Sequence, residues 1–344
     1  MDLTMKERFI RSLKREKVDK VPVCSVTQTG TVDLMHLSGA FWPDAHYDSE
    51  KMATLAIAAH KFAGLEAVRY PFSMFELPEA YGCEISTGTL DSQPHQLDFP
   101  VKDIQDISQL SLLEDLSKNQ GISVIMDATT AIQKQLGDSA ENVPIIAGVL
   151  GPAALSSCLC GVNNYLMWSL LEPDLFLELM NFCTKASLDY INLLYDAGVD
   201  AVLVVDSEAG PDLFPPPLFE SVVVPIYKKM TSQMNGPSLL HMCGNATSIL
   251  EPLGNSGFMA VSIEEKTNMA EASRIIGEKI CLIGNVSPAR TLLLETPDVI
   301  RKETKQCLKD GARILSPGCG IAPRTPLGNL KAFVSARDEY YSGL

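Results

Sequence analysis

Short apolar runs recur along the chain, and amphipathic or polar segments separate them. Eight of these runs predict β-strands, because each is short and nearly continuous in its apolar character. They cover residues 21–27, 67–72, 143–149, 201–206, 238–243, 260–265, 280–286 and 312–317. An apolar run without alternation is typical of a parallel strand that helices cover on both faces.

The segments between the runs carry helix signals. A capping box that begins at Thr4 predicts a helix before the first strand. Residues 48–62 and 173–196 have helical patterns, and a glycine follows each of them closely. Thr296 and Thr325 each precede a proline, an order that favours a helix start. Helices are therefore expected both before and between the strands.

Strand and helix alternate eight times, which predicts an α/β fold of the (β/α)8 TIM barrel type with an additional N-terminal helix. The segment between residues 72 and 143 is too long for one crossover, so we expect an insertion after the second strand, with a hairpin around residues 81–89. We expect residues 1–344 to form a single domain. The alternative is an open, doubly wound sheet, although no G-x-G-x-x-G follows the first strand.

Composition narrows the class of protein. The chain is 46% hydrophobic and 20% charged, as in globular enzymes, and its net charge of −14 argues against nucleic acid as a partner. Its apolar runs are too short to span a membrane, and the charged first twenty residues do not resemble a signal peptide. Nine cysteines, an odd number with uneven spacing, favour reduced thiols and a cytoplasmic location.

Two segments, LLHMCG and LSPGCGIAP, contain candidate metal ligands. His241 and Cys243 are two positions apart in a predicted strand, so their side chains point to the same face. Cys319, in a glycine-rich turn, would be a third ligand. Three protein ligands leave one position open, which is typical of catalytic zinc. The alternatives are a structural metal with a fourth protein ligand, or thiols that pack as small apolar groups.

Further polar residues lie at the carboxyl ends of the predicted strands, where barrel enzymes have their active sites. They include Gln28, Asp206, Glu264 with its neighbour Glu265, and Asn285. Asp206 could act in the site or could cap the following helix. The three proposed ligands lie at the same mouth, so strand position and ligand chemistry indicate the same region.

Several stretches resemble a known superfamily. LLHMCGNATSIL, IGNVSPARTLL and ILSPGCGIAPRTPLGNLKAFVSARD are similar to the uroporphyrinogen-decarboxylase-like superfamily, and so is the opening ERFIRSLKREKVDKVPVCSVTQTGTVDLM. Within it, the chain resembles the methylcobamide:coenzyme M methyltransferases of methanogenic archaea. The decarboxylases share the G-N-V-x-P and P-G-x-G-I-x-P-x-T-P turns but lack the His-x-Cys and distant Cys set. The resemblance covers nearly the whole chain.

The resemblance implies a (β/α)8 barrel with one zinc ion per chain, held by His241, Cys243 and Cys319. It implies methyl transfer from the methyl-Co(III) of a corrinoid protein, which supplies the methylcobamide, to the thiol of coenzyme M. The product would be methyl-coenzyme M, formed in methanogenesis from methanol or methylamines. Coenzyme M and a methylated corrinoid protein are thus the expected partners, and a homodimer is possible because superfamily members are often dimers.

The implied chemistry suggests roles for the other residues at the mouth. Water or a carboxylate, Glu264 rather than Glu265, could fill the open metal position, and Asp206 is the second candidate catalytic residue. The sulfonate of coenzyme M needs a cation, and Arg69 stands alone in the apolar run AVRYPF, where a buried charge requires a partner. Asp206 could also be that partner. The candidate substrate-binding residues are Arg69, Gln28, Asn285 and Arg324.

Two other activities are compatible with the resemblance. A lyase of the uroporphyrinogen decarboxylase type would need no metal and would have a basic pocket. A corrinoid-dependent methyltransferase could use a thiol other than coenzyme M. Metal analysis separates the lyase from the methyltransferases.

Overall fold

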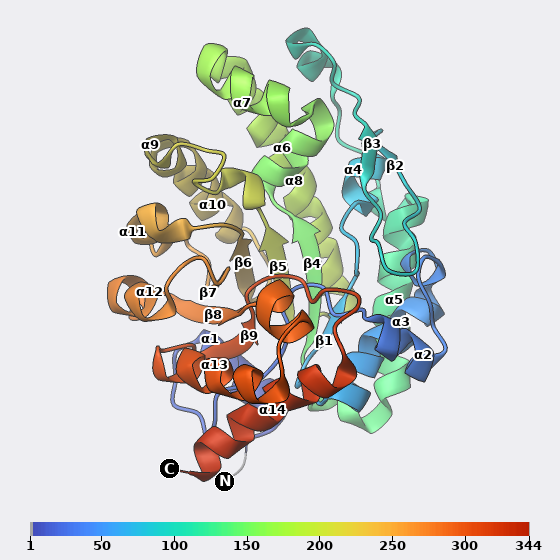
Figure 1. The fold of residues 1–344 in the computed structure, drawn as a ribbon. Coiled ribbons are helices and arrows are strands. Elements are labelled where there is room, and N and C mark those ends of the chain that lie inside the picture. Colours follow the sequence, from blue (N-terminus) through green and yellow to red (C-terminus); the bar gives the residue numbers. More distant parts are fainter. Residues whose placement is uncertain (1–2, 344) are drawn as a thin grey trace.

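The computed structural model describes residues 3–343 of the 344. Seven strands form one parallel sheet in the order β1-β4-β5-β6-β7-β8-β9, and the sheet curls into a barrel (Figure 1). The strands are β1 (Val68–Tyr70), β4 (Ile145–Leu150), β5 (Ala201–Val205), β6 (Ser238–Met242), β7 (Ala260–Ile263), β8 (Cys281–Val286) and β9 (Ile314–Pro317). They correspond to the second to eighth predicted runs, so the TIM-barrel-like α/β fold is confirmed.

The first predicted run, residues 21–27, does not form a full strand. Val23 makes an isolated parallel bridge to Leu315 of β9, and its carbonyl accepts a hydrogen bond of 2.8 Å from the amide of Glu66, just before β1. Pro22 has no N–H to donate, which limits the hydrogen bonds that this segment can make. The segment nevertheless closes the gap between β9 and β1.

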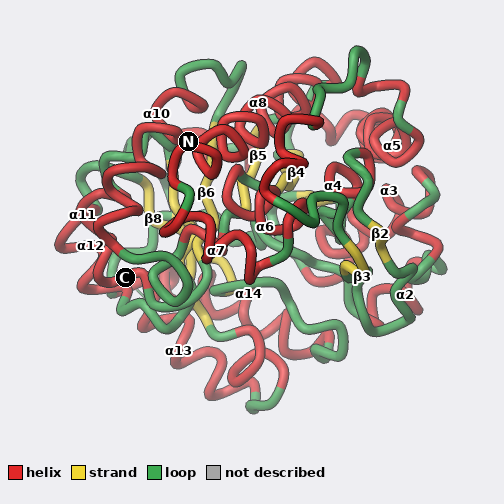
Figure 2. Tube along the Cα trace, turned by 90° about the horizontal axis from the view of Figure 1, so that it is seen from above, coloured by secondary structure: helices red, strands yellow, loops and turns green. Residues whose placement is uncertain are grey.

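Helices surround the strands when the molecule is seen from above (Figure 2). They are α1 (Met5–Leu13), α2 (Val32–Ser38), α3 (Ser49–Ala58), α4 (Glu76–Ala80), α5 (Gln120–Leu136), α6 (Pro152–Cys160), α7 (Val162–Leu171), α8 (Pro173–Ala197), α9 (Pro216–Leu218), α10 (Val224–Thr231), α11 (Leu250–Leu253), α12 (Met269–Ile276), α13 (Pro297–Lys309) and α14 (Leu327–Ser342). The predicted capping box at Thr4 is confirmed. The last helix begins one residue later than predicted, with Pro326 as its N-cap. Within the described part of the chain, no helix is both long and apolar enough to span a bilayer.

Two insertions interrupt the regular alternation. The predicted one follows β1 and contains α4, the antiparallel pair β2 (Glu84–Ile85) and β3 (Gln96–Asp98), and α5. A second one was not predicted: α6 and α7 stand between β4 and the long helix α8. Because they follow the carboxyl end of β4, both helices lie on the side of the barrel that carries the mouth, at the top of Figure 1.

The barrel interior is filled by side chains rather than open. Buried apolar residues of alternate strand positions pack there, including Ala67, Ile146, Leu203, Leu239 and Ile283. Strand alternation places Arg69 on the same face as Ala67 and His241 on the same face as Leu239. Both polar side chains therefore point into the barrel, above its apolar filling.

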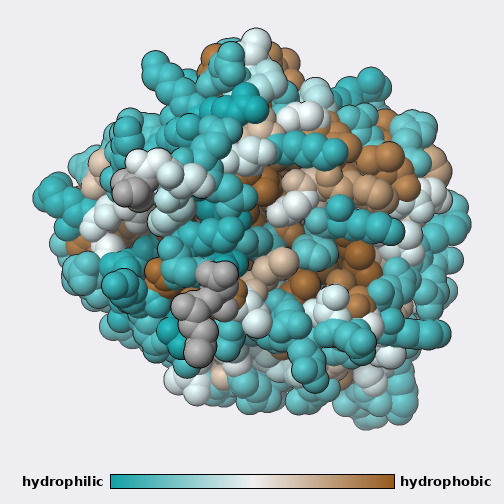
Figure 3. Space-filling view, turned by 90° about the horizontal axis from the view of Figure 1, so that it is seen from below, coloured by the Kyte–Doolittle hydropathy of each residue, from teal (hydrophilic) through white to brown (hydrophobic). Residues whose placement is uncertain are grey.

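Charged side chains close the base, the amino end of the barrel, on the side where α1 and α14 end. Arg8 pairs with Asp19 at 2.7 Å and with Glu66 at 3.1 Å, and Arg337 of α14 pairs with the same Glu66 oxygen at 2.7 Å. The other Glu66 oxygen accepts from the amide of Val23. We call Arg8, Asp19, Glu66 and Arg337 the base cluster. The surface on this side, seen from below, is mainly hydrophilic with smaller hydrophobic areas (Figure 3).

Candidate metal centre

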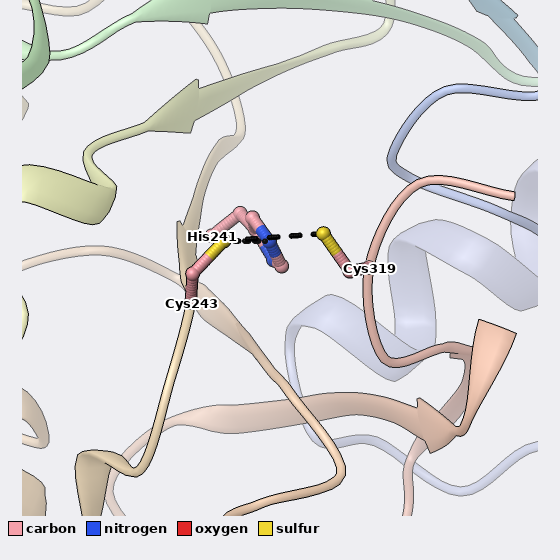
Figure 4. Close-up of side chains that lie close together, drawn as sticks. All are labelled: His241, Cys243 and Cys319. Atoms are coloured by element: carbon pink, nitrogen blue, oxygen red, sulfur yellow. Dashed lines mark hydrogen bonds between the residues drawn. The ribbon is translucent and has the colours of Figure 1, made fainter. Parts of the chain in front are cut away.

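The three predicted metal ligands lie together at the carboxyl ends of the strands. His241 belongs to β6, Cys243 follows the end of β6, and Cys319 lies in the loop after β9. One potential ligand atom of each lies within 4.8 Å of the others. Figure 4 shows the Cys243 sulfur and the His241 ring turned toward the Cys319 sulfur. We call these three residues the mouth cluster.

The distances in this group fit a zinc ion. The Cys243 sulfur lies 3.2 Å from the His241 Nε2 and 3.9 Å from the Cys319 sulfur. Tetrahedral zinc with Zn–S bonds of about 2.3 Å separates two sulfur ligands by about 3.8 Å. One imidazole and two thiolates are also a donor set that suits zinc and disfavours magnesium or calcium. Among residues 3–343, no carboxylate oxygen joins the group within the same 4.8 Å.

Ser262, which sequence reasoning missed, orients the histidine. It lies opposite His241 in the register of β6 and β7, and its Oγ is 3.1 Å from the His241 Nδ1. His241 is only 1% exposed, so this contact determines the ring orientation. An N–H on Nδ1 that donates to Ser262 leaves the Nε2 lone pair facing the two sulfurs. Strand alternation could have revealed Ser262, since it is two residues before Glu264 in the predicted strand.

The two thiols interact with each other and with Ser207. The hydrogen bond between them raises the pKa of Cys243 to about 12 and lowers the pKa of Cys319, so Cys319 loses its proton first. The hydroxyl of Ser207, which follows β5, donates to the Cys243 sulfur over 3.0 Å.

Glu264 and Glu265 both lie close to the loop that carries Cys319, but each is hydrogen-bonded elsewhere. Glu264 accepts from the Gly244 amide at 2.5 Å and pairs with Lys266 at 3.2 Å. Glu265 accepts from the Ser287 hydroxyl at 2.7 Å, and its second oxygen is buried without a partner among the described residues. A side chain at Gly318 would lie 2.7 Å from that oxygen, so only glycine permits this close approach.

Gln28 and Asn285 support the loops around the centre. The Gln28 backbone carbonyl accepts from the Ile321 amide at 2.9 Å, and its side-chain amide donates to the Ile321 carbonyl at 2.5 Å. These two hydrogen bonds, to the amide and to the carbonyl of Ile321, fix the loop that carries Cys319. The Asn285 side chain donates to the carbonyls of Glu264 and Thr267, at 3.2 and 2.8 Å. The side-chain nitrogens of both residues are therefore bonded to loop backbone.

Asp206 lies outside the mouth cluster. Its carboxylate accepts from the amide of Ala154 at 2.7 Å and from the hydroxyl of Tyr227 at 2.6 Å. Ala154 is in the first turn of α6, so Asp206 caps a helix that precedes it in the chain, rather than the one that follows it. Burial raises the pKa of Asp206 to about 7. The predicted capping of the following helix is therefore wrong, since the Asp206 side chain makes its cap hydrogen bond to α6.

Arg69 is fully buried in the barrel interior, and the predicted pairing with Asp206 is absent. Its guanidinium donates to the carbonyls of Val26, at 3.1 Å, and Pro71. In the described residues it forms no ion pair, and burial lowers its pKa to about 10. Arg324, by contrast, is exposed and pairs with Asp91 of the first insertion at 2.5 Å. Only Arg69 of these two candidates is an unpaired cation inside the barrel.

Comparison with known proteins places the chain in a family. Residues 4–340 match the family described as Uroporphyrinogen decarboxylase (URO-D). The chain is 41% identical over 342 residues to the methylcobamide:CoM methyltransferase MtaA of Methanosarcina barkeri, covering 99% of both. It is 33% identical to MtbA of the same activity name from Methanosarcina acetivorans, over 98% of this chain and 99% of the relative.

A solved structure gives the same result. A methyltransferase from Methanosarcina mazei superposes with a TM-score of 0.95 at 42% identity, covering 99% of this chain and all of the other. Sequence and structure therefore agree over practically the full length. The chain belongs to the uroporphyrinogen decarboxylase (URO-D) family, and within it to the group of methyltransferases named methylcobamide:CoM methyltransferases.

Proposed function

We propose that this protein transfers a methyl group from methylcobamide to the thiol of coenzyme M at a zinc ion held by His241, Cys243 and Cys319. The observation that carries the proposal is the mouth cluster itself: one imidazole and two thiols within 4.8 Å, at the carboxyl end of the barrel. A lyase of the decarboxylase type needs no metal and therefore no such donor set. The reaction would form methyl-coenzyme M in methanogenesis from methanol or methylamines.

The charge of the donor set suits a thiol substrate. One neutral imidazole and two thiolates balance the charge of Zn²⁺, so a third, substrate thiolate would give the centre a net charge of −1. Bound zinc would keep the coenzyme M thiol deprotonated at neutral pH, and the excess negative charge would preserve its nucleophilicity. Three histidines in place of this set would leave the centre positive with the thiolate bound.

Each neighbour of the centre has a specific task in this proposal. Ser262 holds the His241 ring so that Nε2 faces the metal position, and Ser207 donates to the Cys243 sulfur, 3.0 Å away. Gln28 holds the loop of Cys319 through Ile321. Glu264 and Glu265 stay candidates for the open position in the resting state, and Glu265 has the free carboxylate oxygen. Asp206 has no such task here, since its carboxylate caps α6.

We assign the sulfonate of coenzyme M to Arg69. This guanidinium points into the barrel from β1, in the same interior that His241 enters from β6, and its protein partners are neutral carbonyls and the Met74 sulfur. Glu76 is near enough to act on Arg69 electrostatically but forms no ion pair with it among the described residues. A buried cation without a directly paired anion is costly, and a sulfonate would supply that partner. Arg324 has Asp91 as its partner at the surface, which argues against the same role.

The sulfonate assignment predicts a change in substrate preference. Arg69→Lys should lower kcat/KM for coenzyme M by about tenfold or more, because a forked, charge-assisted contact is lost. Transfer to 2-mercaptoethanol, which has no sulfonate, should change much less. Arg324→Ala is the matched control and should leave both rates near the wild-type value. Equal losses with both thiols would exclude a sulfonate contact.

The remaining parts of the proposal concern location and assembly. All nine cysteines are free of disulfides, which supports a cytoplasmic protein. The chain is proposed to act as a single domain, and a homodimer stays an untested prediction.

The central experiment measures methyl transfer from methylcobalamin to coenzyme M by the purified protein, together with its metal content. We expect about one zinc per chain, and chelation should remove both zinc and activity without unfolding the protein, since a barrel of this size has a sufficient core of its own. Retained transfer after complete loss of metal would contradict the proposal. So would decarboxylation of uroporphyrinogen by the metal-free protein.

A further inference from the structure

The helix α7 presents an apolar face to solvent. Val162, Met167, Leu170 and Leu171 are 43, 46, 65 and 68% exposed, respectively. We call these four residues the α7 ridge. Leucines this exposed, clustered on one short helix, usually indicate a contact with another molecule.

The sequence around the ridge lacks charge. Positions 142–171 contain no Asp, Glu, Lys or Arg, although a fifth of the whole chain is charged. Part of this stretch is the buried strand β4, but α7 lies at the surface. Charge is depleted and Met and aromatic residues are enriched in the centre of protein interfaces. The composition thus indicates a protein partner rather than a purely solvated helix.

An acidic rim borders the ridge. Glu172, Asp174 and Glu178 are exposed in and just before the first turns of α8, immediately after Leu171. Within residues 3–343, no ion pair involves any of the three. An apolar centre with an acidic rim is complementary to a partner whose apolar patch has a basic border.

The inner side of α7 is connected to the mouth cluster. Tyr165 and Phe176 pack on Phe214, with ring centroids 5.9 and 6.2 Å away, and the Tyr165 hydroxyl donates to the carbonyl of Glu208. Phe214 and Glu208 lie in the loop that begins at Ser207, whose hydroxyl contacts the Cys243 sulfur. The inner side of α7 is therefore linked, through the loop of Ser207, to a proposed zinc ligand.

We infer that the α7 ridge is the docking site for a protein that carries the methylcobamide. This inference rests on the proposed function, because the corrinoid is the methyl donor in that reaction. The barrel interior is filled, so a corrinoid must approach the centre from the mouth. A carrier anchored on α7 would stand beside that mouth, with its basic border on Glu172, Asp174 and Glu178.

The test compares two methyl donors. The double variant Leu170→Asp/Leu171→Asp should lower kcat/KM by about tenfold or more when the donor is a purified methyl-Co(III) corrinoid protein, because two charges enter the apolar contact. Two such carriers, one from a methanol-linked and one from a methylamine-linked system, serve as probes, and at least one should show the loss. With free methylcobalamin, which needs no docking, the rate should stay within about twofold.

A matched control uses the same substitution elsewhere. Leu294 is 75% exposed and follows β8, across the barrel from the β4–β5 connection that carries α7. Leu294→Asp should leave transfer from both kinds of donor unchanged. The milder Leu170→Ser/Leu171→Ser tests the same contact with less risk to folding, and Glu172→Lys/Glu178→Lys should weaken transfer from the carrier protein alone.

The outcomes are distinguishable. If the wild-type protein transfers no methyl group from free methylcobalamin, the proposed function fails. If it does, but the ridge variants keep full activity with both carrier proteins, the docking inference is wrong. The inference is also wrong if the wild-type protein is a dimer that the ridge variants make monomeric, with the kinetics for the carriers unchanged. The ridge would then bind a second copy of this chain.

Discussion

The base cluster and the mouth cluster each combine buried and partly exposed polar side chains, but their charges and hydrogen-bonding atoms are paired to different extents. In the base cluster, two arginines share Glu66 and one also binds Asp19, so the opposite charges are paired within the protein. In the mouth cluster, two thiols and an imidazole face one another without a counter-charge. A cluster whose charges are paired within the protein supports the fold, whereas a cluster whose ligand atoms face one another without a counter-charge is suited to binding a metal ion.

The strongest test of this difference removes a thiol from the mouth. Cys319→Ala should abolish methyl transfer and zinc binding, because a ligand and its negative charge are lost. Its free energy of unfolding, measured on metal-free protein, should change little. The control Cys281→Ala should keep the rate within about tenfold, since small buried thiols mainly pack. Full activity of Cys319→Ala would remove this residue from the site.

The second test removes the shared anion of the base. Glu66→Ala should lower the free energy of unfolding by about 3–5 kcal/mol, because it leaves two buried arginines without this partner. Urea denaturation measures the loss, and the folded fraction should retain its zinc and its kcat/KM. Asp338→Ala, which removes a half-exposed partner of Arg337, should cost less than about 1 kcal/mol. A large loss of zinc in folded Glu66→Ala would remove the functional distinction between the two clusters.

The third test weakens the mouth cluster without removing a ligand. Ser262→Ala deletes the partner of the His241 Nδ1 and should lower zinc affinity by about 10- to 100-fold, as for other residues that orient a ligand. Titration with a competing chelator measures the affinity, and excess zinc should restore much of the activity. Ser316→Ala is the control, because the Ser316 hydroxyl is buried without a described partner. Equal effects of the two changes would show that Ser262 acts only by packing.

The fourth test uses pH, because one carboxyl group on each side of the barrel titrates abnormally in opposite directions. The hydrogen bond from Arg8 holds the pKa of Asp19 below its usual range, so the stability from this group is present above the unfolded pKa and is lost as the pH falls. Burial raises the pKa of Asp206 to about 7, so its contribution is full below about pH 4 and is lost as the pH rises to about 7.

Two asparagine variants separate these effects. Asp19→Asn should flatten the acid side of the stability curve, and Asp206→Asn should flatten the decline between about pH 4 and 7. Denaturant unfolding at a series of pH values provides the measurement. The same slope change in both variants would contradict the opposite signs.

The sequence predicted the parts of the site that depend on local spacing. His241 and Cys243 are neighbours on one strand face, and Cys319 follows another strand, so strand position alone brought the three to one mouth. Glu264 was harder to assign, because β7 ends at Ile263 and strand alternation does not extend to the two glutamates. The helix that Asp206 caps could not be predicted, since its partner Ala154 lies 52 residues away.

The fold, like the site, was predicted where the signal is local and was missed where it is not. Seven apolar runs became strands, but Pro22 and the lack of further pairing left residues 21–27 with a single bridge to β9. The helices α6 and α7 were missed because they continue an uncharged stretch without a clear boundary between strand and helix. Arg69 stood out as a charge in an apolar run, yet its carbonyl partners, Val26 and Pro71, lie in runs that were predicted as regular strands, so these contacts were not foreseen.

The base cluster affects how the chain folds while it is synthesised on the ribosome. Glu66 and Arg337 are 271 residues apart, and Val23 bridges to Leu315. These contacts of the N-terminal segments cannot form until the C-terminal segments have been synthesised. Until β9 and α14 have been synthesised, residues 21–27 lack the strand that lies beside them, and Arg8 does not share Glu66 with Arg337. Nascent chains of this protein therefore expose an unpaired sheet edge for most of translation, a state in which chaperones protect other proteins from aggregation.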